Sequence, residues 1–264
     1  MVDLDAAIGY VVAHGDMVDR ARLAWLRSGH LPPVDVLVKA EMGEAPEGGW
    51  PAYWGADVAS IDATCFRLGE LDDLAAIERP AARRALDWLG RRQRPDGMWE
   101  EDASLAGVAP PWALPGDEEA RLYLTTNAAF WLVAGGPGIG DDGHAARVAR
   151  AAEAFRASLR ADGSWPSFLA AGWLGCALLY HLGWFYESAQ IQVALAERVP
   201  EMSPADTASL AAALRRVGMS PDDWLLQAAQ RRLAETQRSD GSWESDDGEQ
   251  FNVHTTLTAI RALR

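Results

Sequence analysis

The chain has 264 residues, of which 49% are hydrophobic and 23% charged, a balance that indicates a globular protein with a sizeable core rather than a disordered chain. Its formal net charge of −14 at pH 7 repels polyanions, so nucleic acid is not expected as a partner. The two cysteines, Cys65 and Cys176, cannot form a disulfide framework, and the acidic N-terminus is unlike a signal peptide, so we expect a cytoplasmic protein.

A short motif that consists of an acidic residue, glycine, any residue and tryptophan occurs four times. The copies are at residues 47–50, 96–99, 162–165 and 240–243. Asp-Gly favours a tight turn, since glycine accepts positive φ and aspartate bonds the backbone ahead of it. Each copy lies between a segment of helical period and a more apolar one. The chain therefore reads as repeated helix–turn–helix units, with 185–199 and 203–218 as a unit that has lost the motif.

The second helices of these units are the more apolar ones, and they are expected to begin near Asp62, Thr125, Ala171, Asp206 and Asn252. Strand patterns are nearly absent, so the predicted fold is all-α. Residues 168–186 contain one ionisable side chain, His181, and are just long enough to span a bilayer. Three glycines interrupt this segment and no basic residues flank it, which favours a buried helix.

The turn motif also carries a resemblance to a known family. Residues 84–99 contain Arg84, Ala85, Trp88, Leu89, Gln93, Gly97 and Trp99 at the spacing of the QW motif of squalene and hopene cyclases. Partial copies keep Leu233, Gln237, Gly241 and Trp243 in the last unit, and Arg150, Ala151, Phe155, Gly163 and Trp165 in the third. In the first unit Arg20, Ala21, Trp25 and Leu26 precede a long insertion before Gly48 and Trp50. The chain thus resembles the superfamily of these cyclases and the protein prenyltransferases.

This resemblance implies a single domain over residues 1–264, an α/α toroid (barrel) of about five to six helical hairpins. An inner helix ring would line a central cavity, and an outer ring would surround it. In the family, the glutamine of the motif caps the next helix and the tryptophan packs against the preceding turn. Trp50, Trp99, Trp165 and Trp243 are therefore expected to be structural.

If the second helices form the inner ring, their N-terminal ends meet at one mouth, which would bring together Asp62, Asn127, Cys176, Asp206 and His254. The aromatic residues best placed to line the cavity are Trp54, Tyr123, Trp131, Trp173, Tyr180, Trp184 and Phe251. Such a pocket suits an isoprenoid chain, and aromatic faces stabilise carbocations. The simpler interpretation is that most of these aromatic residues belong to the core.

Class II terpene cyclases protonate an alkene with the middle aspartate of Asp-x-Asp-Asp-Thr-Ala. Residues 60–65 resemble this motif and keep Asp62 and Thr64, but Ser60 and Ala63 replace both flanking acids. The resemblance assigns proton donation to Asp62. Asp206-Thr207-Ala208 looks similar, and an aspartate near a helix start is often a cap, so a capping role for Asp62 stays open.

Two metal chemistries are alternatives. Protein prenyltransferases hold zinc through aspartate, cysteine and histidine, and here Cys176 and His254 match two of these positions, whereas Leu174 stands where the aspartate is needed. Magnesium-dependent prenyl chemistry needs Asp-Asp-x-x-Asp, and acidic pairs such as Asp72-Asp73 and Asp141-Asp142 lack the third acid, so solvated caps are expected there. We therefore assign no metal ligand and no required cofactor, with zinc or magnesium kept as alternatives.

Together these features predict a terpene-cyclase-like enzyme that binds an isoprenoid in an aromatic-lined cavity, with Asp62 and His254 as candidate catalytic residues. The alternatives are a prenyltransferase-like protein with a degenerate zinc site, and a non-catalytic toroid that binds an apolar ligand or a partner. A peripheral membrane contact could deliver such a substrate. The oligomeric state has no sequence signal.

Overall fold

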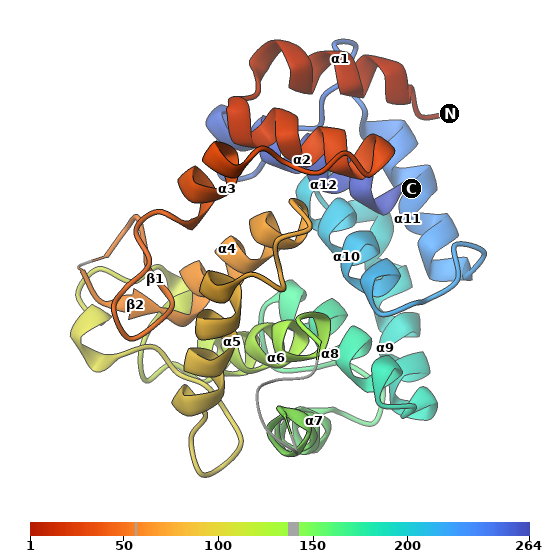
Figure 1. The fold of residues 1–264 in the computed structure, drawn as a ribbon. Helices are drawn as coiled ribbons and strands as arrows, with labels where there is room; N and C mark the ends of the chain where they lie inside the picture. The colour runs from red at the N-terminus through yellow and green to blue at the C-terminus, as the bar shows by residue number, and fades with distance from the viewer. Residues whose placement is uncertain (56, 137–142) are drawn as a thin grey trace. The chain divides into compact units, whose positions relative to one another are not determined.

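The computed structural model describes residues 1–55, 57–136 and 143–264, and almost all of its regular structure is helical (Figure 1). The all-α prediction is therefore confirmed. The exception within the described residues is a short antiparallel pair of strands, β1 (Trp50–Pro51) and β2 (Ala59–Ser60), in which Trp50 lies opposite Ser60. It forms a hairpin directly before the helix that carries Asp62.

The chain divides into two compact units, described separately below. Unit 1 contains Met1–Ala40, Asp73–Ala75 and Gln192–Arg264, and unit 2 contains Glu41–Asp72 and Ala76–Ile191. The helices of unit 1 are α1 (Leu4–His14), α2 (Met17–Ser28), α3 (Val34–Glu41, whose last residue belongs to unit 2), η3 (Val199–Glu201), α10 (Pro204–Arg216), α11 (Trp224–Thr236), η4 (Glu249–Phe251) and α12 (Asn252–Ala262). Those of unit 2 are α4 (Ile61–Asp72), α5 (Pro80–Arg92), η1 (Ala103–Leu105), η2 (Pro111–Ala113), α6 (Glu118–Ala134), α7 (Ala145–Ser158) and α8 (Leu169–His181), while α9 (Phe185–Arg198) runs from unit 2 into unit 1.

Most predicted helix starts agree with the structure, including the α9–α10 pair that lacks the turn motif. The start of α6 was predicted wrongly near Thr125, because the helix begins at Glu118. Asp117 caps it by accepting the N–H of Ala120, and the acidic side chains of Glu118 and Glu119 interact favourably with the helix N-terminus. The early start matters because it puts Tyr123 inside the helix.

The four turns share the same pair of backbone hydrogen bonds, which confirms the internal repeat. In three of them the aspartate (Asp96, Asp162 or Asp240) accepts the N–H of the residue two positions later, and the glycine between them has φ between +79° and +87°. That φ lies in the left-handed region, which favours glycine. A Cβ on the glycine would come within 3.0 Å of the first helix of another hairpin: α7 for Gly97, α9 for Gly163 and α1 for Gly241. Each turn therefore packs closely on another hairpin.

The glutamine and tryptophan of the motif are structural, as predicted. The Trp99 and Trp243 indoles donate to the carbonyl oxygens of Leu89 and Leu233, each ten residues earlier, at 2.7 and 2.9 Å. Gln93 donates to the carbonyl oxygen of Arg147 in α7 at 2.8 Å, which ties α5 to the next hairpin. Gln237 makes the corresponding bonds to the backbone of Asp3, directly before α1.

The structure corrects the first copy of the motif. Arg20, Ala21, Trp25 and Leu26 belong to α2, and a further helix, α3, lies between them and the first turn. Aligned on Trp50 without an insertion, the glutamine position falls on Glu44, and Glu44 accepts a hydrogen bond from Arg84 Nε of α5 at 2.8 Å. Glu44 thus ties its turn to the next hairpin as Gln93 does. The mispairing arose because the Arg-Ala and Trp-Leu pairs of α2 match the motif by residue type alone.

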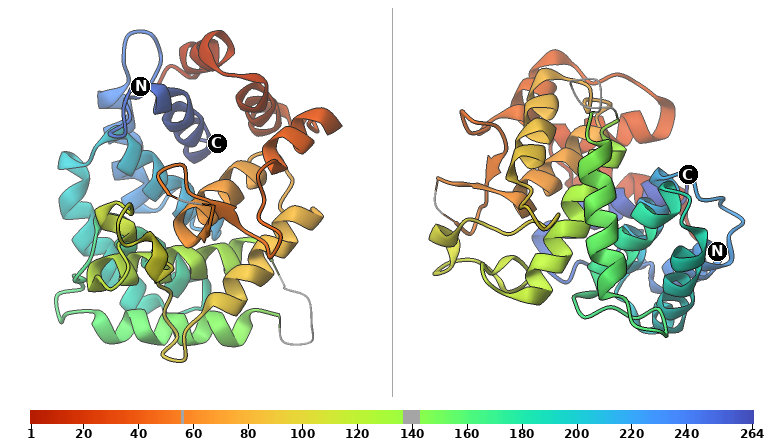
Figure 2. Two further views of the ribbon diagram at one scale, coloured as in Figure 1. Left: turned by 90° about the vertical axis from the view of Figure 1, so that its left-hand side faces the viewer. Right: turned by 90° about the horizontal axis from the view of Figure 1, so that it is seen from below.

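The second helices of the hairpins pack in series within each unit. In unit 2, α6 contacts both α4 and α8 (Figures 1 and 2). In unit 1, α12 contacts both α10 and α2, so a C-terminal helix packs against an N-terminal one. The core of unit 1 joins both chain ends: Ala7, Val11, Leu23, Ala208, Leu233, Trp243, Leu257, Ala259 and Ile260.

The apolar segment 168–186 forms α8 and the start of α9. Nine residues of α8 are buried, from Ala171 to Leu179, which agrees with the buried-helix prediction. Among the described residues, the helices are too short or too polar to cross a bilayer.

Candidate active site

The start of α4 is capped by groups other than Asp62. Glu101, which is only 4% exposed, accepts the N–H groups of Ile61 and Asp62 at 2.9 and 3.0 Å and the hydroxyl of Ser60 at 2.7 Å. Ser60 Oγ in turn accepts the N–H of Ala63 at 3.1 Å. Ser60 and Glu101 therefore satisfy the first turn of the helix, and this capping needs no contribution from the Asp62 side chain.

The Asp62 carboxylate is held by two aromatic side chains. Tyr123 of α6 donates its hydroxyl proton to Oδ1 at 2.9 Å, and the Trp112 indole of η2 donates to Oδ2 at 3.1 Å. Asn127, one helical turn after Tyr123, donates to the Tyr123 hydroxyl oxygen at 3.1 Å and so orients it toward Asp62. The half-buried Asp62 side chain thus has a fixed position and an apolar border formed by an indole and a phenol ring.

Burial makes this cluster sensitive to charge. Desolvation, with a further contribution from the Asp62 charge, raises the pKa of Glu101 to about 6 despite its three hydrogen bonds. Burial, followed by the Asp62 charge, also raises the pKa of Tyr123 and of the neighbouring Cys65 well above their ordinary values. Tyr123 is therefore a hydrogen-bond donor at neutral pH. Burial and the neighbouring Asp62 charge therefore favour the protonated form of the Glu101 carboxyl group.

Asp62 and Asp206, which look alike in sequence, occupy different positions relative to the starts of their helices. Thr64 and Thr207 both bond the carbonyl oxygen four residues earlier, at Ser60 and Ser203, which aligns the two helix starts. In this alignment Asp62 matches Ala205, and Asp206 lies one residue further along the helix. In α10 the cap is Ser203, which accepts the N–H of Asp206 at 3.0 Å. The two aspartates therefore occupy different faces of their helices.

Sequence reasoning missed Glu101 and Trp112. A possible signal for Glu101 was its position two residues after Trp99, the last residue of the complete motif. Acidic residues are rarely buried, so a buried role for Glu101 was not expected. Trp112 lies in an irregular stretch with three prolines, at 110, 111 and 115, which carries no periodic pattern.

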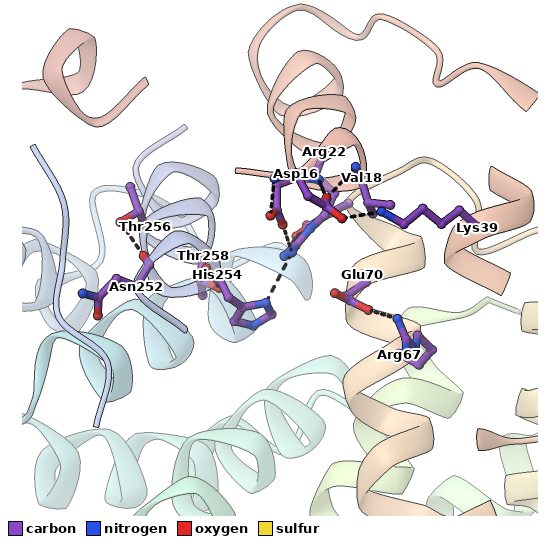
Figure 3. A network of polar contacts seen from close by, with 12 residues as sticks. Asp16, Val18, Arg22, Lys39, Arg67, Glu70, Asn252, His254, Thr256 and Thr258 are labelled. Atoms are coloured by element: carbon purple, nitrogen blue, oxygen red, sulfur yellow. Dashed lines mark hydrogen bonds and ion pairs between the residues drawn. The ribbon is translucent and has the colours of Figure 1, made fainter. Parts of the chain in front are cut away.

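His254 lies in unit 1, at the start of α12, and faces a buried ion cluster (Figure 3). Its Nδ1 lies 3.3 Å from Arg22 Nη1, and arginine is always a donor, so Nδ1 accepts and the ring is neutral with its proton on Nε2. Burial and the Arg22 charge lower the pKa of His254 to about 3. His254 is consequently a weak base, and the adjacent guanidinium opposes a bound cation.

Asp73 belongs to the same cluster, and its predicted role as a solvated cap is wrong. It is 4% exposed and accepts hydrogen bonds from Arg22 at 2.8 Å and from Arg261 at 2.6 Å. The cluster therefore joins α2, α12 and the residues after α4 within unit 1. The other acidic pair discussed above, at 141–142, lies outside the described residues.

The remaining predicted substrate-binding residues lie on several elements of the two units. Trp131 is buried against Gly69 of α4, and Trp173 is buried in α8. Tyr180 makes an edge contact with Phe185, with ring centroids 5.4 Å apart. Trp54 lies in the turn between β1 and β2, and Phe251 ends η4; both are half-buried.

Cys176 is fully buried between two helices. Its sulfur lies 3.4 Å from the Ser188 hydroxyl of α9. Within the described ranges, groups of three or more His, Cys, Asp and Glu that could hold a metal ion are not found. The structure thus offers no built zinc site at Cys176 in that part of the chain.

Comparisons with known proteins agree on the fold. No protein-family model and no curated protein matches the sequence. Solved structures do match: a protein from Actinoplanes is 20% identical with a TM-score of 0.60, and the alignment covers 94% of this chain and 89% of that one. The type II terpene cyclase MstE from Scytonema, in complex with its substrate geranylgeranyl dihydroxybenzoate, is 16% identical with a TM-score of 0.61, covering 98% and 95%.

Further MstE structures include a complex with the product merosterolic acid A, which is also 16% identical with a TM-score of 0.60 and covers 98% and 94%. At these identities the likeness establishes the fold rather than the activity. The chain therefore has the terpene-cyclase-like fold that its QW motif predicted.

Proposed function

We propose that this protein is a class II-like terpene cyclase that protonates an alkene of a linear isoprenoid with Asp62. The observation that carries the proposal is the held Asp62 carboxyl group, bonded by Tyr123 and Trp112 and adjacent to the buried Glu101. MstE, which shares the fold, binds an isoprenoid substrate, which supports the choice of substrate class.

The arrangement fits the two demands on such an acid. It must carry a proton at rest, and the nearby Glu101 carboxylate favours the neutral form of Asp62. It must also release that proton readily, and the donors Tyr123 and Trp112 stabilise the carboxylate that forms, more strongly than they stabilise the neutral acid. In the proposed mechanism, Glu101 therefore takes the part of the flanking acids that residues 60 and 63 lack.

The proposal includes the α/α toroid of six hairpins, α1–α2 through α11–α12. Its support is a repeated contact: the turns of unit 2 pack on a later hairpin in the chain, whereas the last turn packs on α1. Gln237 makes the same wrap-around contact with Asp3. The last repeat thus contacts the first repeat in the way that the earlier turns contact the next hairpin. Closure of a ring requires this contact.

The test compares Asp62→Asn with Asp206→Asn, using geranylgeranyl dihydroxybenzoate and other linear polyprenes as substrates and mass spectrometry to detect cyclised isomers. Loss of the proton donor should lower turnover by at least about 100-fold in Asp62→Asn. Asp206→Asn should stay within about threefold of the unmodified protein, because Asp206 occupies another register.

Melting temperatures of both variants provide the control for folding. Full activity in Asp62→Asn would contradict the proposal. So would matching losses of activity and melting temperature in both variants, since these would indicate two structural residues.

A further inference from the structure

Asn127 carries a buried amide close to the candidate acid. Its side chain is 8% exposed, and its Nδ2 donates to the Tyr123 hydroxyl oxygen at 3.1 Å. The two residues are four positions apart in α6, so their side chains lie on the same face of the helix. Tyr123 in turn donates to Asp62 Oδ1 at 2.9 Å. The three side chains therefore form a hydrogen-bond chain that ends on the Asp62 carboxyl group.

The charge of Asp62 fixes the direction of this chain. An ionised carboxylate only accepts hydrogen bonds, and a phenol has a single hydroxyl proton. Whenever Asp62 is ionised, Tyr123 therefore donates that proton to Oδ1, and only its oxygen is left for Asn127. The amide must then present its NH₂ group, which is the donor, to Tyr123. Burial and the Asp62 charge raise the pKa of Tyr123, so the phenol keeps the proton for this bond.

Both hydrogen bonds of the chain run toward the carboxylate. Hydrogen bonds in series polarise one another, so the amide makes the Tyr123 hydroxyl a stronger donor to Asp62. The Trp112 indole, which can donate but not accept, bonds Oδ2 at 3.1 Å. These donors stabilise the ionised form of Asp62 more than the neutral form, which makes Asp62 a stronger acid. A chain of the opposite direction, with Tyr123 donating to position 127, would remove the donor from Oδ1.

We propose that Asn127 is a positioning residue that sets the acid strength of Asp62 through the Tyr123 hydroxyl group. The proposal rests on the function proposed above and is an alternative to a substrate contact of Asn127. In the proton-transfer step the Asp62 O–H bond breaks, and its proton forms a C–H bond with the alkene electron pair. The carbocation later releases a proton to water and the Asp62 carboxylate takes one from water, so the substrate is isomerised without net change. Asn127 acts by holding Tyr123 as the donor to that carboxylate.

A double-mutant cycle tests whether Asn127 acts through Tyr123. With geranylgeranyl dihydroxybenzoate as substrate, Asn127→Leu should lower kcat about three- to tenfold and leave KM within about twofold, because the chain weakens and no substrate contact is lost. Tyr123→Phe should lower kcat by at least the same factor. In the Tyr123→Phe background, Asn127→Leu should cost less than about twofold, since the hydroxyl group through which Asn127 acts is already gone.

Asn127→Asp should reverse the chain. The new carboxylate accepts the Tyr123 hydroxyl proton in place of Asp62, so kcat should fall by at least about 30-fold, further than in Asn127→Leu. Thr126→Val is the matched control, because the Thr126 hydroxyl donates to the backbone carbonyl oxygen of Tyr123 at 2.9 Å rather than to its side chain. Its kcat should stay within about twofold of the unmodified protein. Melting temperatures of all variants provide the control for folding.

Two kinetic results would overturn the proposal. An equal loss of kcat from Asn127→Leu in the unmodified and the Tyr123→Phe backgrounds would show that Asn127 acts independently of Tyr123. A loss that appears in KM alone would indicate a substrate contact of Asn127 instead.

The second measurement needs no turnover. Infrared titration identifies the Asp62 carboxyl band as the one that Asp62→Asn removes, whereas the band of the nearby Glu101, with a pKa of about 6, remains. In Asn127→Leu the midpoint of the Asp62 band should rise by at least about half a pH unit, and Thr126→Val should leave it unchanged. An unchanged midpoint in Asn127→Leu would overturn the proposal. A fully active Asp62→Asn would contradict the proposed function alone, because this titration does not depend on turnover.

Discussion

At the scale of single residues, His254 combines burial with a neighbouring positive charge. The Arg22 guanidinium bonds its Nδ1, and the pKa of about 3 keeps the ring neutral when the protein is folded. The unfolded chain protonates this histidine below about pH 6.5. The unfolded state therefore binds more protons between pH 6.5 and 3, and stability falls as the pH falls through that window.

This predicts a difference between His254→Gln and the unmodified protein. As the pH falls from 6.5 to 5, protonation of His254 in the unfolded state should lower the free energy of unfolding by about 2 kcal/mol. In His254→Gln this part of the pH dependence should be absent. Urea unfolding at several pH values measures it. His14→Gln, at an exposed histidine of α1, is the control for loss of an imidazole. Equal pH slopes in His254→Gln and the unmodified protein would show that His254 is protonated in the folded state.

The sequence indicated Asp62 but could not reveal what holds it. Resemblance to a motif singled out Asp62 and Thr64, and the structure places both in the first turn of α4. The partners of Asp62 come from residues 50 and 61 positions later, and their contact depends on how η2 and α6 pack against α4. Such contacts between distant segments leave no local pattern.

At the scale of elements, close helix packing depends on glycines in α8. A Cβ on Gly175 would lie 2.0 Å from Cε1 of Phe155, a fully buried residue of α7. The two helices can approach to this distance only because residue 175 has no side chain. In the sequence the glycines of this segment look like interruptions of an apolar run, whereas in the structure Gly172 and Gly175 allow close packing of α8.

Gly175→Ala should therefore lower the free energy of unfolding by about 2–3 kcal/mol, through displacement of Phe155. Gly9→Ala is a matched substitution at an exposed position of α1, where a Cβ meets nothing within 4 Å. It should raise stability by about 0.5–1 kcal/mol through helix propensity. Chemical denaturation of both variants provides the measurement, and equal effects would contradict the packing argument.

At the scale of the whole molecule, the repeat made most of the fold predictable. The turn motif recurs in four of the hairpins, and in α9–α10, which lacks it, the apolar periodicity was enough to predict both helices. The pairing of α1, α2 and α3 was not predictable, because α3 is short and the match of α2 to the motif was coincidental. The packing of the N-terminal helices against the C-terminal ones in unit 1 also leaves no pattern in the local sequence, because it is a contact between the first and last repeats.

That joining predicts the effect of a truncation. Removal of residues 222–264 deletes Trp243, Leu257 and Ile260 from the core that Ala7 and Val11 share. The α1–α2 hairpin should then lose its packing and exchange its amide hydrogens rapidly, with a fall in far-ultraviolet helical signal beyond that of the deleted helices. Retention of slow amide exchange in α1 would contradict this account of unit 1.

The most direct test of the central claim is turnover of geranylgeranyl dihydroxybenzoate in D₂O. Protonation by Asp62, whose carboxyl proton exchanges with solvent, predicts a cyclised product that contains one deuterium bound to carbon. Asp62→Asn should yield no such product. A cyclised product without deuterium would contradict initiation by protonation, and with it the role proposed for Asp62.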